Sequence, residues 1–139
     1  MALAPELAAD AGADSCHPER ARRDAGAGAI HGGDWPAAAP DADSWGGLAG
    51  MIRCADPFGR YPGHVGADQA IALDRALPLF TANAARAMRL EGVTGQLAAG
   101  LWAEPIGQDR APETTESAAL AALRPSATLF EGRVVHGDL

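Results

Sequence analysis

The sequence predicts an α/β chain, and three observations support this class. Residues 28–31 form a short apolar stretch that is typical of a buried strand and runs into a glycine turn. Residues 70–88 carry apolar side chains at helical spacing, which gives the clearest helix signal of the chain. Residues 127–130 and 134–136 are apolar stretches on either side of Glu131-Gly132-Arg133, which predicts a β-hairpin.

The helices and loops follow in chain order. Residues 1–15 are rich in Ala and Asp and predict a frayed helix or no regular structure, and a further helix is expected from residue 17, with a proline in its first turn. A short helix is predicted over residues 45–53, followed by a loop rich in Pro and Gly over residues 56–66. The helix over residues 70–88 should break near Phe80-Thr81, because Pro78 removes a backbone donor, and Gly92 should end its second part.

The last third of the chain favours strands. Residues 95–106 alternate weakly between apolar and polar, which predicts a hairpin or strand pair. Residues 108–125 read as an acidic loop that contains a short helix around residues 116–123, before the C-terminal hairpin.

Composition and charge exclude several classes of partner. The 139 residues are 47% hydrophobic, but many of these are alanines, and the net charge of −7 argues against nucleic acid or an anionic membrane. No stretch approaches the ~20 apolar residues of a membrane span, and the N-terminus lacks the positive and apolar regions of a signal peptide. Cys16 and Cys54 have no metal-binding spacing, so we expect free thiols in a cytoplasmic protein.

Asp34 is the main candidate for chemistry. It lies in Gly32-Gly33-Asp34-Trp35-Pro36, directly after the predicted strand, on a turn whose glycines let a ligand approach the backbone closely. A carboxylate at a strand exit can ligate a metal or take a proton from water. The alternative is an aspartate that only caps a turn or a helix.

The other polar candidates have structural alternatives of their own. His31 and Trp35 are candidate substrate contacts. The structural alternatives are that His31 is a partly buried strand histidine and that Trp35 packs the turn. Thr81 and Asn83 are expected to pin their helix to the strand end by hydrogen bonds. The remaining histidines, His17, His64 and His136, are expected to be structural or on the surface. The less favoured alternative is a zinc site made from Cys16, His17 and Cys54.

The order of these motifs resembles the C-terminal part of the amidohydrolase superfamily, in particular its YtcJ-like (amidohydrolase-3) branch. Three pieces carry the resemblance: residues 24–36 with the strand and its Gly-Gly-Asp-Trp-Pro turn, residues 76–87 with Phe-Thr-Ala-Asn-Ala-Ala-Arg-Ala, and residues 95–103 followed by 129–135. The resemblance implies a fragment of a (β/α)8 TIM barrel, with its last strand and helices over residues 24–92. It also implies part of a small composite β-sandwich over residues 93–139, preceded by an N-terminal segment over residues 1–23.

The resemblance also implies an activity. Members of the family are metal-dependent hydrolases that cleave C–N bonds of amides and formamides with metal-activated water. The aspartate after their last barrel strand ligates the metal or accepts the proton, and Asp34 is its counterpart here. A divalent metal, with zinc expected, and a small amide-type substrate would be the ligands of the intact enzyme.

The chain departs from the family pattern where the other metal ligands should be. It contains no His-x-His pair and no lysine, and Gly33 stands where serine is usual. We expect residues 1–139 alone to bind no metal tightly and to be inactive, with the rest of the barrel in a longer chain or a second polypeptide. The alternative is an inactive remnant, or a small helical interaction module without a metal site.

Overall fold

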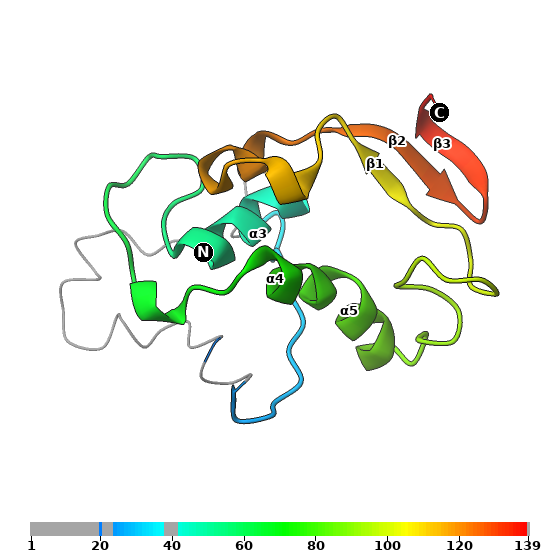
Figure 1. Ribbon diagram of the computed structural model, residues 1–139, viewed down its shortest axis with the longest axis horizontal. Helices are drawn as coiled ribbons and strands as arrows, with labels where there is room; N and C mark the ends of the chain where they lie inside the picture. Colours follow the sequence, from blue (N-terminus) through cyan, green and yellow to red (C-terminus); the bar gives the residue numbers. More distant parts are fainter. Residues whose placement is uncertain (1–19, 21–23, 38–41, 139) are drawn as a thin grey trace.

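The computed structural model describes Arg20, residues 24–37 and residues 42–138. Its helices gather in one body, and a three-stranded sheet extends from one side of that body (Figure 1). The α/β class predicted from the sequence is therefore confirmed in outline. None of the helices in these described ranges has the length and hydropathy needed to cross a membrane.

Helix α3, Ser44–Arg53, forms as the sequence predicts. The side chain of Asp43 accepts a hydrogen bond from the backbone N–H of Trp45 at 2.9 Å, which caps its N-terminus. Cys54 ends it in the left-handed conformation (φ 49°), and its N–H donates to the carbonyl of Gly50. Leu48 and Ala49 are its fully buried apolar residues.

Helices α4, Leu73–Phe80, and α5, Ala82–Ala87, form the broken helix that the sequence predicts. The 3-10 helix η2, Ala67–Gln69, precedes them. The break lies at Thr81 (φ −127°, ψ −97°), three residues after Pro78, whose missing N–H weakens the helical ladder.

The end of α5 differs from its predicted position. The helix ends at Ala87 rather than at Gly92, because Arg89 adopts a left-handed conformation (φ 60°). The N–H of Leu90 then reaches back to the carbonyl of Ala85 at 2.8 Å, a closing bond typical of helix C-termini.

The C-terminal third contains the sheet and two 3-10 helices, η3, Pro112–Thr114, and η4, Ser117–Ala122. Strands β1, Ile106–Gln108, β2, Pro125–Phe130, and β3, Arg133–Gly137, pair antiparallel in the order β1-β2-β3. Glu131 and Gly132 both have positive φ (50° and 76°), as a two-residue hairpin turn requires. The predicted C-terminal hairpin and the short helix before it are thus confirmed, the latter as a 3-10 helix.

Two strand predictions are wrong. Residues 95–105 form turns and irregular backbone, because Gly95 and Gly100 adopt positive φ (91° and 90°) and break any regular pairing; only Ile106 enters a strand. Residues 28–31 have no strand assignment, since none of the described strands lies beside them, and Ile30 is 55% exposed. The single sheet among the described residues is antiparallel, so the barrel and the sandwich remain inferences from resemblance.

The hydrophobic core lies where α3, α4 and η4 meet. Leu120 and Leu123 are its largest fully buried side chains, and they pack against α3 from the far end of the sequence. Its buried members are Leu48, Ala49, Ile71, Ala76, Leu79, Leu120 and Leu123. Arg124, directly after this cluster, binds Asp43 at the N-terminus of α3, so the helical body is also tied together at its surface.

Candidate functional site

The Asp34 turn lies on the surface. Residues 32–37 are all exposed, and Asp34 itself adopts the left-handed conformation (φ 50°). Trp35 is 59% exposed and is joined to Pro36 by a cis peptide bond. The Asp34 carboxylate and the Trp35 ring are therefore both open to a ligand.

Residues 29–31, just before this turn, are anchored on the junction between α4 and α5. The N–H of His31 donates to the carbonyl of Leu79 at 3.1 Å. The side-chain amide of Asn83 donates to the carbonyl of Ala29, also at 3.1 Å. Two backbone groups of the segment are thus bonded to helix ends and not to a strand.

These contacts decide the roles predicted for Thr81 and Asn83. Asn83 pins α5 to the segment before the turn, as predicted. Thr81 does not, because its hydroxyl donates to the carbonyl of Leu77 within its own helix at 3.0 Å. This back-bond is typical of threonine near a helix end and supports the break at residue 81.

The His31 ring is half-buried against two helices. It stacks on the Phe80 ring with centroids 4.3 Å apart and planes 28° from parallel. On another side it faces Gly47 of α3, where an added Cβ would lie 2.5 Å from Nε2 and 2.8 Å from Cε1 of the histidine. The ring therefore fills a space that only a glycine at position 47 leaves open.

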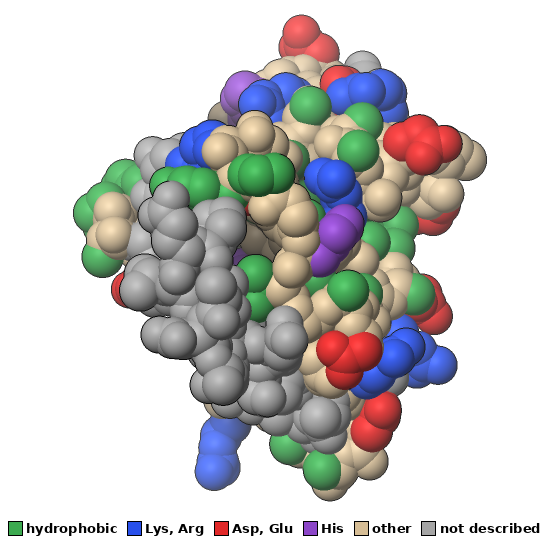
Figure 2. Space-filling model, turned by 90° about the vertical axis from the view of Figure 1, so that its left-hand side faces the viewer, with side chains coloured by type: hydrophobic (Ala, Val, Ile, Leu, Met, Phe, Trp, Pro, Cys, Tyr) green, Lys and Arg blue, Asp and Glu red, His purple; other side chains and the backbone are tan. Residues whose placement is uncertain are grey.

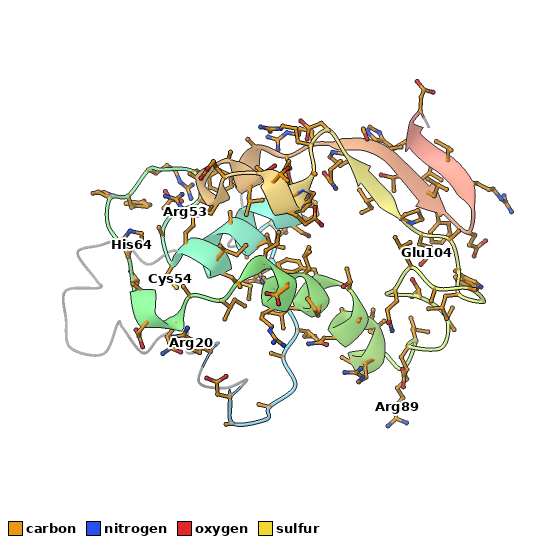
Figure 3. All side chains as sticks on the ribbon, viewed as in Figure 1. Arg20, Arg53, Cys54, His64, Arg89 and Glu104 are labelled. Carbon is orange, nitrogen blue, oxygen red and sulfur yellow. The ribbon has the colours of Figure 1, made fainter. Side chains whose placement is uncertain are left out.

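Of the other histidines and the two cysteines, His64, His136 and Cys54 lie in the described part of the chain. His64 lies beside the end of α3, where its Nδ1 is 2.9 Å from the carbonyl oxygen of Arg53 (Figure 3). Cys54 is a free thiol at the same helix end, and burial together with the negative charge of Asp68 raises its pKa. His136 lies in β3, and Cys16 and His17 fall outside the described residues.

A metal site is not assembled within the described part of the chain. In it, no three His, Cys, Asp or Glu side chains lie close enough to share an ion. A catalytic zinc takes about three protein ligands. Asp34 alone cannot meet that requirement, so the described residues could supply only one of the ligands of such a site.

Asp56 is a buried polar residue that sequence reasoning missed. Its side chain is 1% exposed and accepts hydrogen bonds from the backbone N–H groups of Phe58, Arg60 and Tyr61 at 2.6–3.2 Å. The Arg60 guanidinium adds two further bonds at 3.3 Å. An aspartate that opens a Pro/Gly-rich loop is the signal that could have found it, since such side chains commonly bind the N–H groups that follow.

The electrostatics of Asp56 follow from these bonds. Burial alone would raise the pKa of its carboxyl, but the hydrogen bonds from the Arg60 side chain and from the N–H groups of Phe58 and Arg60 outweigh burial and lower the pKa below 3.8. The same loop presents Arg60 over the rings of Phe58 and Tyr61, 5.1 and 5.9 Å from their centroids. The hydrogen bonds of Asp56 thus hold an exposed loop together, and its carboxylate is not free to act as a catalytic acid.

The described residues line a hollow, and the face shown in Figure 2 has no large area of a single charge sign. The hollow is open, has a volume of about 380 Å³, and is lined by Leu101, Trp102, Ala103, Glu131 and Gly132. None of the predicted site residues lines it. On the face shown in Figure 2, arginine and acidic side chains lie interspersed with apolar ones.

Comparison with known proteins identifies a family. A family model described as "Amidohydrolase family" matches residues 6–136. No curated protein and no solved structure matches the chain significantly. The matched range includes the Asp34 turn, the α4–α5 junction and almost all of the C-terminal hairpin.

Proposed function

This chain belongs to the amidohydrolase family, and we propose that it is the C-terminal part of a metal-dependent hydrolase of the YtcJ-like branch. Its reaction is hydrolysis of C–N bonds in small amides or formamides. The observation that carries this proposal is the family match over residues 6–136, which takes in the Asp34 turn.

Within that function, Asp34 supplies a carboxylate at the open end of the anchored segment. Its exposure on a left-handed turn leaves the side chain accessible from outside the helical body. A carboxylate so placed can serve as a ligand or as a proton acceptor for water. Trp35, exposed beside it, offers a flat apolar wall for a substrate.

The divalent metal of this function, with zinc the first choice, requires ligands beyond the described residues. A family metal would polarise water or the scissile carbonyl. The described residues contribute one candidate ligand, so we derive no step through the metal here. The remaining ligands would come from the rest of the barrel, in a longer chain or in a second polypeptide that works in the same cytoplasm.

The test uses the native product, recovered through an affinity tag fused in its own gene to the polypeptide that contains residues 1–139. Any polypeptide that carries or binds this segment is then recovered with it. The sample is analysed for zinc and assayed on a panel of N-formyl and N-acyl amines. We expect metal-dependent hydrolysis that falls at least ~100-fold in Asp34→Asn, as for loss of a general base or ligand.

The matched control is Asp74→Asn, which removes a carboxylate that is 72% exposed on α4. It should leave hydrolysis unchanged. A native product without bound metal that hydrolyses nothing in the panel would instead support an inactive remnant or a small helical interaction module.

A further inference from the structure

The His31 ring packs against Gly47, a glycine in the interior of α3 that lowers the stability of this helix. Glycine within a helix is less favourable than alanine by about 1 kcal/mol. At Gly50 of the same helix, an added Cβ would meet nothing closer than 3.9 Å. At Gly47 it would meet the His31 ring at 2.5 Å, so this glycine makes room for that ring.

A second contact also holds the His31 ring. The Phe80 ring stacks on the His31 ring with centroids 4.3 Å apart, and the backbone N–H of His31 donates to the carbonyl of Leu79. One residue thus contacts both α3 and α4. We call the space bounded by Gly47, Leu79 and Phe80 the His31 seat.

We propose that His31 is a positioning residue, whose place in the His31 seat sets the position of the Asp34 carboxylate. His31 is the last half-buried residue before Asp34, and residues 32–34 between seat and carboxylate are exposed. Only Gly32 and Gly33 separate the anchored His31 from Asp34, so the place of His31 fixes where the turn begins. A ring enclosed on two sides is suited to this task more than to contact with a substrate.

The inference rests on the proposed function, since a position for Asp34 matters only if its carboxylate works. Its test separates the two. Gly47→Ala fills the seat, and Gly50→Ala is the matched control on the same helix. Amide hydrogen exchange and ¹H–¹⁵N spectra of the full chain report residues 31–35 directly.

In Gly47→Ala we expect the resonances of residues 32–35 to shift and the exchange of the His31 amide to accelerate about tenfold, while core amides such as that of Leu123 keep their protection. Gly50→Ala should leave residues 31–35 unchanged. His31→Ala should shift the same resonances, and adding Gly47→Ala to it should shift them no further, because the seat is then empty.

Identical spectra for residues 32–35 in Gly47→Ala and Gly50→Ala would overturn the positioning role, whatever Asp34 does. A functional arm on the tagged native product completes the test: Gly47→Ala should lower kcat and leave KM unchanged, and Gly50→Ala should change neither. If Asp34→Asn leaves hydrolysis intact, the proposed function fails and the positioning of a working carboxylate fails with it. If Asp34→Asn abolishes hydrolysis and Gly47→Ala does not lower kcat, only the positioning role is overturned.

Discussion

The side-chain amide of Asn83 binds the backbone carbonyl of Ala29 at 3.1 Å, across 54 positions of sequence. This bond lies next to the one between His31 and Leu79. In an unbroken helix the carbonyl of Leu79 would accept from the N–H four residues later. The break at Thr81 ends that pattern, so the kink in the helix is what makes the anchor available.

Asn83→Asp should loosen this anchor without changing the size of the side chain. The carboxylate cannot donate to Ala29 and faces its carbonyl oxygen, so we expect a loss of about 1–2 kcal/mol in the free energy of unfolding, measured by urea denaturation. The charge-matched control is Gln96→Glu, at an exposed position. Equal midpoints for the two variants would contradict the prediction.

Asp56→Asn should destabilise the chain more than any exposed Asp→Asn change. The substitution places an NH₂ group where a carboxylate oxygen accepted from Arg60 and Tyr61, and takes that acceptor from their backbone N–H groups. We expect a loss of about 3 kcal/mol in urea denaturation. Asp74→Asn, at a 72% exposed carboxylate, should stay within about 0.5 kcal/mol of the parent chain.

The stability of the chain should depend on pH through Asp56. Since the pKa of this carboxyl is lowered in the folded state, its contribution is complete above the ordinary value of 3.8 and is lost as the pH falls through the folded value. The free energy of unfolding should therefore be level above about pH 5 and decline below it. In Asp56→Asn the decline should be shallower, and parallel curves for the two proteins would refute the assignment.

Gly95→Ala and Gly100→Ala should differ, although both glycines have the same φ (91° and 90°). At Gly100 the added Cβ meets nothing within 4 Å, so only backbone strain of about 1–2 kcal/mol is expected. At Gly95 it would lie 2.5 Å from Cβ of Ala85, and crowding should add about 1–3 kcal/mol. Thermal or urea unfolding of both variants measures the difference, and a smaller loss at Gly95 would be inconsistent with this packing.

Leu123→Ala should expose how much of the stability lies in the junction between η4 and α3. The side chain is 0% exposed, so its removal leaves a cavity and should cost about 2–5 kcal/mol. Leu97→Ala, at an 83% exposed side chain, should change the free energy of unfolding little. A loss in the free energy of unfolding below about 1 kcal/mol for Leu123→Ala would contradict the role of Leu123 in the core.

The features predicted correctly from the sequence are those with local causes. The break near Thr81 follows from Pro78, and the C-terminal hairpin follows from a two-residue turn in which Gly132 tolerates positive φ. The hydrogen bond from Asn83 to the segment before the turn confirms the role predicted for this residue.

The features that the sequence could not reveal depend on partners far along the chain. The stretch over residues 28–31 is apolar enough for a strand, but its neighbours are helix ends, so it does not pair in a sheet. The seat of His31 depends on Gly47, whose role is invisible until the two meet in space. The placement of Asp34 as a working carboxylate stays a prediction.

The packing of α3 on η4 has a consequence for folding during synthesis on the ribosome. Asp43 at the start of α3 meets Arg124 across 81 positions of sequence. At a synthesis rate of ~5–20 residues per second, α3 waits about 4–16 s before its partner is made. Until then the nascent chain lacks Leu120 and Leu123, the two largest fully buried side chains of its core.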